Sequence, residues 1–200
     1  MNDAPSARWF DEWSLEQRQE YAARFRTLAA SGRDIDGEAR LVDALADRRA
    51  RILDAGCGAG RMAAYLATQG HDVLGVDIDP LLIEAGRADY PGLPLQVLDL
   101  REVSPVLGEF DLVASAGNVM VFLEPGTERE VIAALASVLR PGGRAVFGFA
   151  TDRAYTHDQL DADAASVGWI REGRWATWQL DPFTDDADWA VSLYRAPQLG

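Results

Sequence analysis

The stretch RILDAGCGAGR at residues 51–61 places three glycines at alternate positions after a short apolar segment. Arg51–Ala55 is typical of a buried strand, and residues 59–69 have helical spacing, with Gly70 available to end the helix in the left-handed conformation. A glycine turn between a strand and a helix lets a ligand approach the backbone closely. A tight connection that binds nothing is the alternative, and this stretch alone leaves both interpretations open.

The order of strand, turn and helix continues on the C-terminal side of this stretch. Apolar segments predict strands at residues 72–76, 95–98, 111–114 and 144–149, with helices between them, and two further helices at 15–30 and 36–48 precede the first strand. Residues 169–180 and 187–195 predict an antiparallel hairpin, because the turn-rich sequence DPFTDD separates them. We therefore expect an α/β fold: a doubly wound, Rossmann-like sheet of seven strands, mostly parallel, with a C-terminal antiparallel hairpin and helices on both faces.

Three helix starts have recognisable capping residues. Asp79 precedes Pro80 and reads as the N-cap of the helix over 80–89, where proline is favoured at the first position. Thr127 with Glu130, and Thr156 with Gln159, have the spacing of capping boxes. The sequence PGG at residues 141–143 is expected to end the helix that follows Thr127.

Length and composition indicate one domain. With 200 residues, of which 48% are hydrophobic, the chain can form one sizeable core, and we expect a single domain over 1–200, with residues 1–35 as an N-terminal helical lid and 36–200 as the core. No apolar run approaches the roughly 18 residues that span a bilayer, and the opening residues lack the pattern of a signal peptide. We expect a cytoplasmic protein that does not enter a membrane.

The charged residues exclude several chemistries. All 19 basic residues are arginine, which removes mechanisms that need a lysine amine. The net charge of −13 argues against a nucleic-acid partner, which requires clustered basic groups. Cys57 is the single cysteine, so no internal disulfide can form. His71, expected at the surface, and His157, expected as a solvated first-turn residue, do not have metal-ligand spacing, so we expect no metal site.

A nicotinamide-binding fingerprint is the main competitor for the glycine turn. It requires G-x-G-x-x-G after a strand, with an acidic residue about 20 positions later. Gly56 and Gly58 match its first two glycines, but Arg61 occupies the third place, and Asp54 adds a carboxylate at the end of the strand. Both departures oppose a bound pyrophosphate.

At this point the sequence resembles the class I S-adenosylmethionine-dependent methyltransferases, whose first motif is acidic-x-G-x-G-x-G. Asp54, Gly56, Gly58 and Gly60 match that motif. Asp77 ends the second strand, where the family places the carboxylate that binds the ribose hydroxyls. Asp99 ends the third strand, where the family places a residue that accepts a hydrogen bond from the adenine amino group. Three carboxylates thus end three successive parallel strands at one edge of the sheet. For Asp79, a capping role is favoured over a cofactor contact.

The resemblance also covers later segments, DLVASAGNVMVFL after the fourth strand and LRPGGRAVFGF around the fifth, and extends over roughly residues 37–195. It implies that the cofactor is S-adenosylmethionine, that the product is S-adenosylhomocysteine, and that the cofactor contacts are Asp54, Ala55, Gly56, Cys57, Gly58, Gly60, Arg61, Asp77, Ile78, Asp99, Leu100, Ser115 and Ala116. Cys57 otherwise reads as a small buried side chain with no base beside it.

In the family that the sequence resembles, the N-terminal helices and the region after the fourth strand form the walls of the acceptor pocket. The side chains expected to face a small-molecule methyl acceptor are Trp13, Tyr21, Asn118, Met120 and Tyr155, and core packing is their alternative. In the N-terminal helix, Tyr21 and Phe25 share one face, so at most one of the flanking residues Arg24 and Arg26 should reach inward.

The expected reaction is transfer of the methyl group to this acceptor by in-line displacement. A sulfonium methyl is already activated, so the protein mainly has to hold the two reactants and exclude water. No catalytic side chain is therefore assigned. Two other functions stay open at this point: a non-catalytic S-adenosylmethionine-binding protein, and a nicotinamide-dependent oxidoreductase.

Overall fold

The computed structural model describes residues 7–198 and contains one seven-stranded sheet. The strands are β1 (Arg51–Ala55), β2 (Asp72–Asp77), β3 (Leu95–Val97), β4 (Phe110–Ser115), β5 (Leu139–Ala150), β6 (Ile170–Trp175) and β7 (Trp189–Arg195), in the order β3-β2-β1-β4-β5-β7-β6. Strand β7 runs antiparallel to its neighbours β5 and β6, and the other six strands share one direction. The expected fold class is confirmed.

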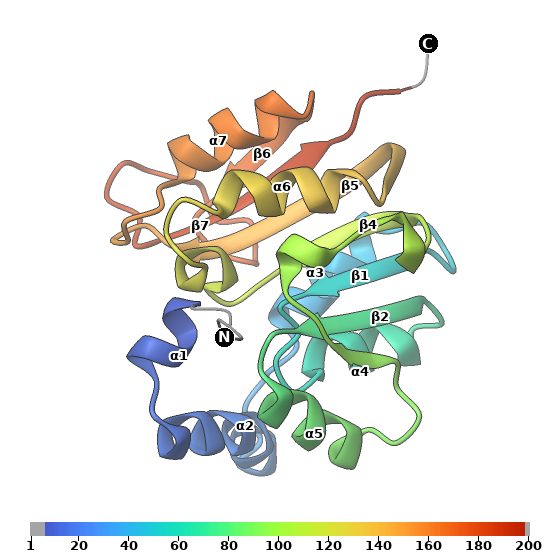
Figure 1. Cartoon of the computed structure of the whole chain (residues 1–200), viewed down its shortest axis with the longest axis vertical. Helices are drawn as coiled ribbons and strands as arrows, with labels where there is room; N and C mark the ends of the chain where they lie inside the picture. Colours follow the sequence, from blue (N-terminus) through green and yellow to red (C-terminus); the bar gives the residue numbers. More distant parts are fainter. Residues whose placement is uncertain (1–6, 199–200) are drawn as a thin grey trace, which may run out of the picture.

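The helices are α1 (Arg8–Glu12), α2 (Leu15–Ala30), α3 (Gly37–Leu45), α4 (Arg61–Thr68), α5 (Pro80–Asp89), α6 (Glu128–Ala136) and α7 (His157–Ser166), with three 3₁₀ turns, η1 (Leu100–Glu102), η2 (Pro105–Leu107) and η3 (Val119–Phe122). Figure 1 shows α6 and α7 on one side of the sheet, while α2 lies beside α5 and α1 lies next to α2, away from α7. No helix of the described part is long and apolar enough to cross a membrane.

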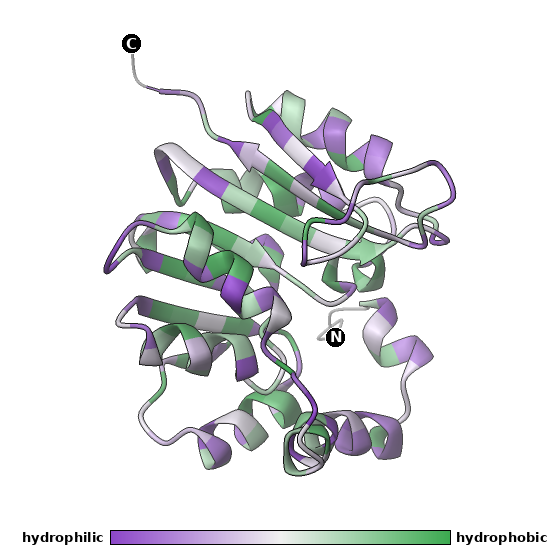
Figure 2. Cartoon of the chain, turned by 180° about the vertical axis from the view of Figure 1, so that it is seen from behind, coloured by the Kyte–Doolittle hydropathy of each residue, from purple (hydrophilic) through white to green (hydrophobic). Residues whose placement is uncertain are grey.

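Two hydrophobic clusters cover the two faces of the sheet. One contains Phe110, Phe147 and Tyr194 with apolar residues of α6 and α7, and the other contains Ile52 and Leu112 with residues of α3, α4 and α5. Figure 2 shows the central strands mostly in the hydrophobic colour. The strand order reverses between β1 and β4, so the sheet opens a ligand-binding crevice at their carboxyl ends.

A third, smaller cluster joins the N-terminal helices to α5. It consists of Ala7, Trp9, Ala22 and Leu82, with the partly buried rings of Trp13, Tyr21 and Phe122 among the residues around it. Trp9 stacks on Trp13 with ring centroids 4.7 Å apart. The segment α1, which the sequence analysis did not predict, thus has its own packing contacts.

Several expectations about helix ends are confirmed. Asp79 caps α5 by accepting a hydrogen bond from the Leu81 N–H at 2.9 Å. Thr156 and Gln159 form the predicted capping box of α7.

The capping box at Thr127 is not formed. The Thr127 backbone is already helical, and its hydroxyl donates to the Glu124 carbonyl instead. The expectation that PGG ends this helix was also wrong, because α6 ends at Ala136 and residues 141–143 lie inside β5. His71 was wrongly expected at the surface: its ring is 1% exposed, with Nε2 3.0 Å from Asp43 Oδ1.

Candidate active site

The glycine turn connects β1 to α4 and lies against the loop that follows β4. A Cβ atom at Gly56 would lie 2.3 Å from a Val119 methyl group, so only glycine permits this close packing. At Gly58 the nearest atom to an added Cβ would be Cε1 of Tyr21, at 3.8 Å. A Cβ there would be in ordinary van der Waals contact with Tyr21, and the Gly58 backbone itself lines both cavities, where a ligand can approach it.

Two adjoining cavities lie along this turn. The first contains about 750 Å³ of empty space, including the part open to solvent, and the second about 680 Å³ on the same measure. Tyr21, Gly56, Gly58, Ala116 and Gly117 line both cavities. The two spaces thus meet between the glycine turn, the end of β4 and helix α2.

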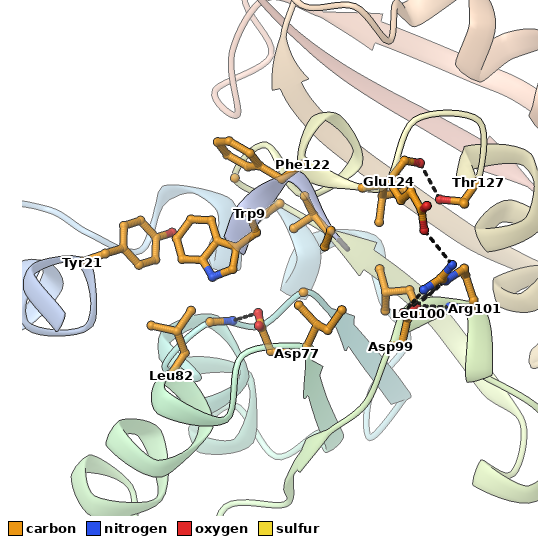
Figure 3. A pocket seen from close by; sticks show the side chains of 18 residues that line it. Trp9, Tyr21, Asp77, Leu82, Asp99, Leu100, Arg101, Phe122, Glu124 and Thr127 are labelled. Atoms are coloured by element: carbon orange, nitrogen blue, oxygen red, sulfur yellow. Dashed lines mark hydrogen bonds and ion pairs between the residues drawn. The ribbon is translucent and has the colours of Figure 1, made fainter. Parts of the chain in front are cut away.

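Asp77 lies at the floor of the first cavity (Figure 3). Its Oδ2 accepts a hydrogen bond from the Gly58 N–H at 2.8 Å, and its Oδ1 accepts from the Asp79 N–H at 2.9 Å. Burial raises the pKa of this carboxyl to about 6 despite these bonds. A carboxylate has more acceptor sites than the two used here, so Asp77 can still receive ligand hydroxyls.

Asp54 lines the second cavity and is 1% exposed. Its Oδ2 accepts from the Ala63 N–H in α4 at 3.1 Å. Burial raises its pKa to about 7, because no directly bonded cation offsets the cost of desolvation. A buried carboxylate of this kind favours a cationic ligand group beside it.

Asp99 lines the far end of the first cavity, but its oxygens are engaged by Arg101. The Arg101 guanidinium bonds both carboxylate oxygens, at 2.7 Å for the shortest contact, and also reaches Glu124 at 3.0 Å (Figure 3). Burial raises the pKa of Asp99, but the hydrogen bonds from Arg101 outweigh it and hold the pKa below its usual value. Arg101 and Glu124 therefore link the ends of β3 and η3 across this end of the cavity.

Arg61 is fixed at the start of α4. It forms an ion pair with Glu38 at 3.1 Å, bonds the Ile35 carbonyl, and lies 4.6 Å from the centre of the Phe25 ring. It thereby ties α2 and α3 to the glycine turn. Of the two flanking arginines of α2, Arg26 lines the second cavity and Arg24 does not, as expected, although Arg26 pairs with Asp89 at 2.6 Å.

The remaining expected cofactor contacts divide into two groups. Ile78, Leu100, Cys57 and Ala116 line one or both cavities, and burial raises the Cys57 pKa well above its usual value, so the thiol stays protonated. Ala55, Gly60 and Ser115 line neither cavity: Ala55 and Ser115 are buried in the sheet, and Gly60 starts α4 with a left-handed backbone. These three residues belong to β1, to β4 and to the start of α4 and are not part of the lining of either cavity.

The five side chains expected to face the acceptor differ in whether they lie at a cavity. Of these five, Tyr21 alone lines the two cavities; Trp13 and Asn118 line neither, and Trp13 packs behind Tyr21 against Trp9. Asn118 ties the loop after β4 to β5, because its Oδ1 accepts from the Ala150 N–H at 2.8 Å.

Met120 and Tyr155 do not lie at either cavity, contrary to the expectation from sequence. Met120 is 1% exposed, and both residues belong to the core on the α6 and α7 face. The Tyr155 hydroxyl donates to Asp163 at 2.8 Å, and burial raises its pKa, so it stays protonated. Met120 follows β4 and Tyr155 follows β5, but both side chains turn into the core.

Sequence reasoning missed several residues that line the cavities. Among them are Trp9, Leu82, Arg101, Val119, Phe122, Leu123, Glu124 and Thr127 in the first cavity, and Glu38, Asp89 and Tyr90 in the second. Position supplied a usable signal for Leu82 and Arg101, which closely follow the acidic ends of β2 and β3. No comparable signal marks Trp9, since its placement depends on contacts with distant segments.

Comparison with known proteins agrees with this site. A family model described as a methyltransferase domain matches residues 52–143. The solved structure of a TehB-like S-adenosylmethionine-dependent methyltransferase from Corynebacterium glutamicum is 42% identical, superimposes with a TM-score of 0.85, and the match covers 90% of this chain and 98% of that one.

Curated relatives are more distant and act on different acceptors by name. The magnesium-protoporphyrin O-methyltransferase of Rhodobacter capsulatus is 32% identical over 123 residues, which cover 58% of this chain and 53% of the relative. The ribosomal protein L11 methyltransferase of Dechloromonas aromatica is 36% identical over 96 residues, covering 46% of this chain and 30% of the relative. The matches therefore span about half or less of these two relatives. On the similarity to the Corynebacterium enzyme, which covers nearly that whole protein, the chain belongs to the class I S-adenosylmethionine-dependent methyltransferases.

Proposed function

We propose that this methyltransferase acts on a small-molecule acceptor that carries no carboxylate or phosphate group, and that the two adjoining cavities hold its cofactor and the reacting part of the acceptor. The observation that carries the cofactor assignment is the meeting of Asp54, Asp77 and Asp99 at one edge of the sheet, around an open glycine turn. When bound, S-adenosylmethionine supplies a methyl group on a positively charged sulfur, activated for displacement.

The residues fit that cofactor at three places. Asp77 offers acceptor oxygens for ribose hydroxyls, and Asp54 offers a buried negative charge for the ammonium group of the methionine portion. Leu100 and Ile78 supply apolar surface for the adenine ring. We assign Asp99 to the adenine end of the cavity, where its contact with Arg101 fixes the direction in which its carboxylate points.

The protein's part in the reaction is to bind, orient and exclude water. Trp9, Tyr21 and Phe122 cover the cavity on the side of the N-terminal helices (Figure 3). Where these side chains exclude water, electrostatic interactions in the site are stronger. The walls of the cavity hold the two reactants close together. Burial raises the pKa of Tyr21, and its hydroxyl therefore stays protonated and can donate to a bound group.

The charge of the cavities supports the choice of acceptor. Six carboxylates line them, Glu38, Asp54, Asp77, Asp89, Asp99 and Glu124, against the three arginines Arg26, Arg61 and Arg101. Each of these arginines already contacts a carboxylate of the set. Asp54, Asp77 and Asp99 are assigned to the cofactor, and every arginine of the described lining already has a carboxylate partner, so an anionic acceptor would find no unpaired cation there. We also place the reaction in the cytoplasm, in line with the single cysteine.

Paired acceptors that differ only in a carboxylate test this proposal. Phenethylamine with phenylalanine, and phenol with 4-hydroxybenzoate, are suitable pairs; S-adenosylhomocysteine release and product mass are measured for each. We expect kcat/KM to be higher for the uncharged or amine member of whichever pair reacts. A consistent preference for the carboxylated members would contradict the acceptor class, and S-adenosylhomocysteine binding without turnover of any acceptor would favour a non-catalytic binding protein.

A further inference from the structure

The buried carboxylate of Asp79 holds more partners than helix capping requires. Its Oδ1 accepts from the Leu81 N–H at 2.9 Å, which completes the cap of α5. Its Oδ2 accepts from the Trp9 indole N–H at 2.9 Å and from Arg18 Nη1 at 3.0 Å. One oxygen thus serves its own helix, and the other binds one residue from α1 and one from α2.

The two N-terminal partners depend on Asp79 in return. Asp79 is fully buried, and its negative charge is compensated by Arg18, whose side chain is 17% exposed and lies over the Phe10 ring at 5.1 Å. If α1 and α2 moved away, the carboxylate would lose both donors, and a buried charge without partners is costly. The two helices and the Asp79 carboxylate therefore hold each other in place.

Asp79 is also connected to the cofactor cavity. Its backbone N–H donates to Oδ1 of Asp77 at 2.9 Å, and the other oxygen of Asp77 holds the Gly58 N–H. Trp9, the indole bound by Asp79, lines the same cavity as Asp77, and Figure 3 shows the two side chains beside the same space. The segment 77–79 therefore fixes both the floor of the cavity and one of its covering side chains.

We propose that Asp79 is a positioning residue that docks helices α1 and α2 over the cofactor cavity, in addition to capping α5. The proposal rests on the cofactor site assigned above and adds the element that closes it. Asp79 acts through Trp9 and Arg18.

Asp79→Ser separates docking from capping. Serine is as good an N-cap as aspartate, but its hydroxyl is too short to reach Trp9 and Arg18. Trp9→Phe and Arg18→Met remove the donors from the other side and leave the cap intact. Thr156→Ala is the matched control, since it removes the cap of α7 and none of the contacts described above with α1 or α2.

Two measurements are made on each variant of the full chain. Hydrogen exchange of residues 8–30 in the ligand-free protein reports docking without any cofactor, and calorimetry with S-adenosylhomocysteine reports the cavity. We expect faster exchange of residues 8–30 in all three docking variants and affinity about tenfold weaker in Asp79→Ser, in line with loss of charge-assisted hydrogen bonds. Thr156→Ala should lower Tm and leave both readouts unchanged.

The double variant Asp79→Ser with Arg18→Met should be no weaker than Asp79→Ser alone, because both changes remove the same contact and Arg18, unlike Trp9, lines neither cavity. Wild-type exchange and affinity in the docking variants would overturn the proposal, as would independent, multiplying effects in the double variant. If Asp79→Ser does not fold, Trp9→Phe and Arg18→Met decide the question. If the wild-type protein does not bind S-adenosylhomocysteine, the proposed function fails, while the exchange data still decide the role of Asp79.

Discussion

The Asp77 carboxylate accepts the backbone N–H of Gly58 at 2.8 Å, although the two residues are 19 positions apart in the chain. The end of β2 thereby holds the glycine turn that leaves β1. An acidic side chain at this position orients the turn before any ligand binds and keeps acceptor capacity for the ligand itself. One buried carboxyl group thus holds the turn and, in the proposed cofactor site, keeps acceptor capacity for the ribose hydroxyls.

Replacing Asp77 should weaken cofactor binding strongly. In Asp77→Ala the Gly58 N–H and the ligand hydroxyls lose their acceptor, at a cost of about 1 to 3 kcal/mol, which is roughly five- to 150-fold in affinity for S-adenosylhomocysteine. Asp72→Ala is the control, since Asp72 begins the same strand with a side chain that is 71% exposed. Equal affinity in wild type and Asp77→Ala by calorimetry would refute the assignment.

Stability of the ligand-free protein should depend on pH through Asp54. Burial raises its pKa from the ordinary 3.8 to about 7, so the folded state binds the proton more tightly than the unfolded state. This contribution is fully present below about pH 4 and is lost as pH rises through about 7. Asp54→Asn removes it, because asparagine stays neutral and can still accept from the Ala63 N–H.

Urea unfolding at pH 5 and pH 8 measures this dependence. The free energy of unfolding should fall between these values more steeply in wild type than in Asp54→Asn. General repulsion from the net charge of −13 affects both proteins nearly equally and is removed by the comparison. Identical pH dependence in the two proteins would show that Asp54 titrates normally.

Deletion of the residues before Arg33 should leave a folded sheet and weaken cofactor binding. The deletion removes Trp9 and Tyr21 from the cavity wall, whereas both faces of the sheet keep their own hydrophobic clusters. Circular dichroism checks the fold, and calorimetry with S-adenosylhomocysteine checks the site. Binding as tight as that of the full chain would show that α1 and α2 do not act as a lid, and the acceptor site would then have to be sought after β4.

Nucleic acids should not bind. A net charge of −13 opposes contact with the phosphate backbone, because nucleic-acid binding depends on basic groups that release counterions. Fluorescence anisotropy with duplex DNA and structured RNA at physiological salt should show negligible binding. A micromolar complex that weakens with added salt would contradict this expectation and reopen the choice of acceptor.

Local sequence signals predicted most of the framework of this fold. The bounds of β1, α2 and α5 agree with the structure, because hydrophobic spacing and residues such as Asp79 and Pro80 act over a few positions. The same applies to the three acidic strand ends, since parallel strands bring their carboxyl ends to one edge. Long-range pairing was required for the rest: the bonds of Asp79 to Trp9 and Arg18 join residues 70 and 61 positions apart.

Side-chain direction was the other feature that the sequence did not supply. Met120 and Asn118 lie two residues apart after β4, yet one is buried in the core and the other bonds β5. The capping box at Thr127 failed for a related reason, because the Thr127 backbone is helical and its hydroxyl is turned back toward the Glu124 carbonyl. His71 was predicted at the surface because its burial depends on α3, which brings Asp43 beside it.

The central claim is that the glycine turn, with Asp54 and Asp77, binds S-adenosylmethionine rather than a dinucleotide. Titration calorimetry of the wild-type protein with S-adenosylmethionine, S-adenosylhomocysteine, NAD and NADP tests it directly. The account predicts saturable 1:1 binding of the first two ligands and no heat of binding for the nicotinamide cofactors. Tight binding of NAD or NADP, together with no binding of S-adenosylmethionine, would contradict it.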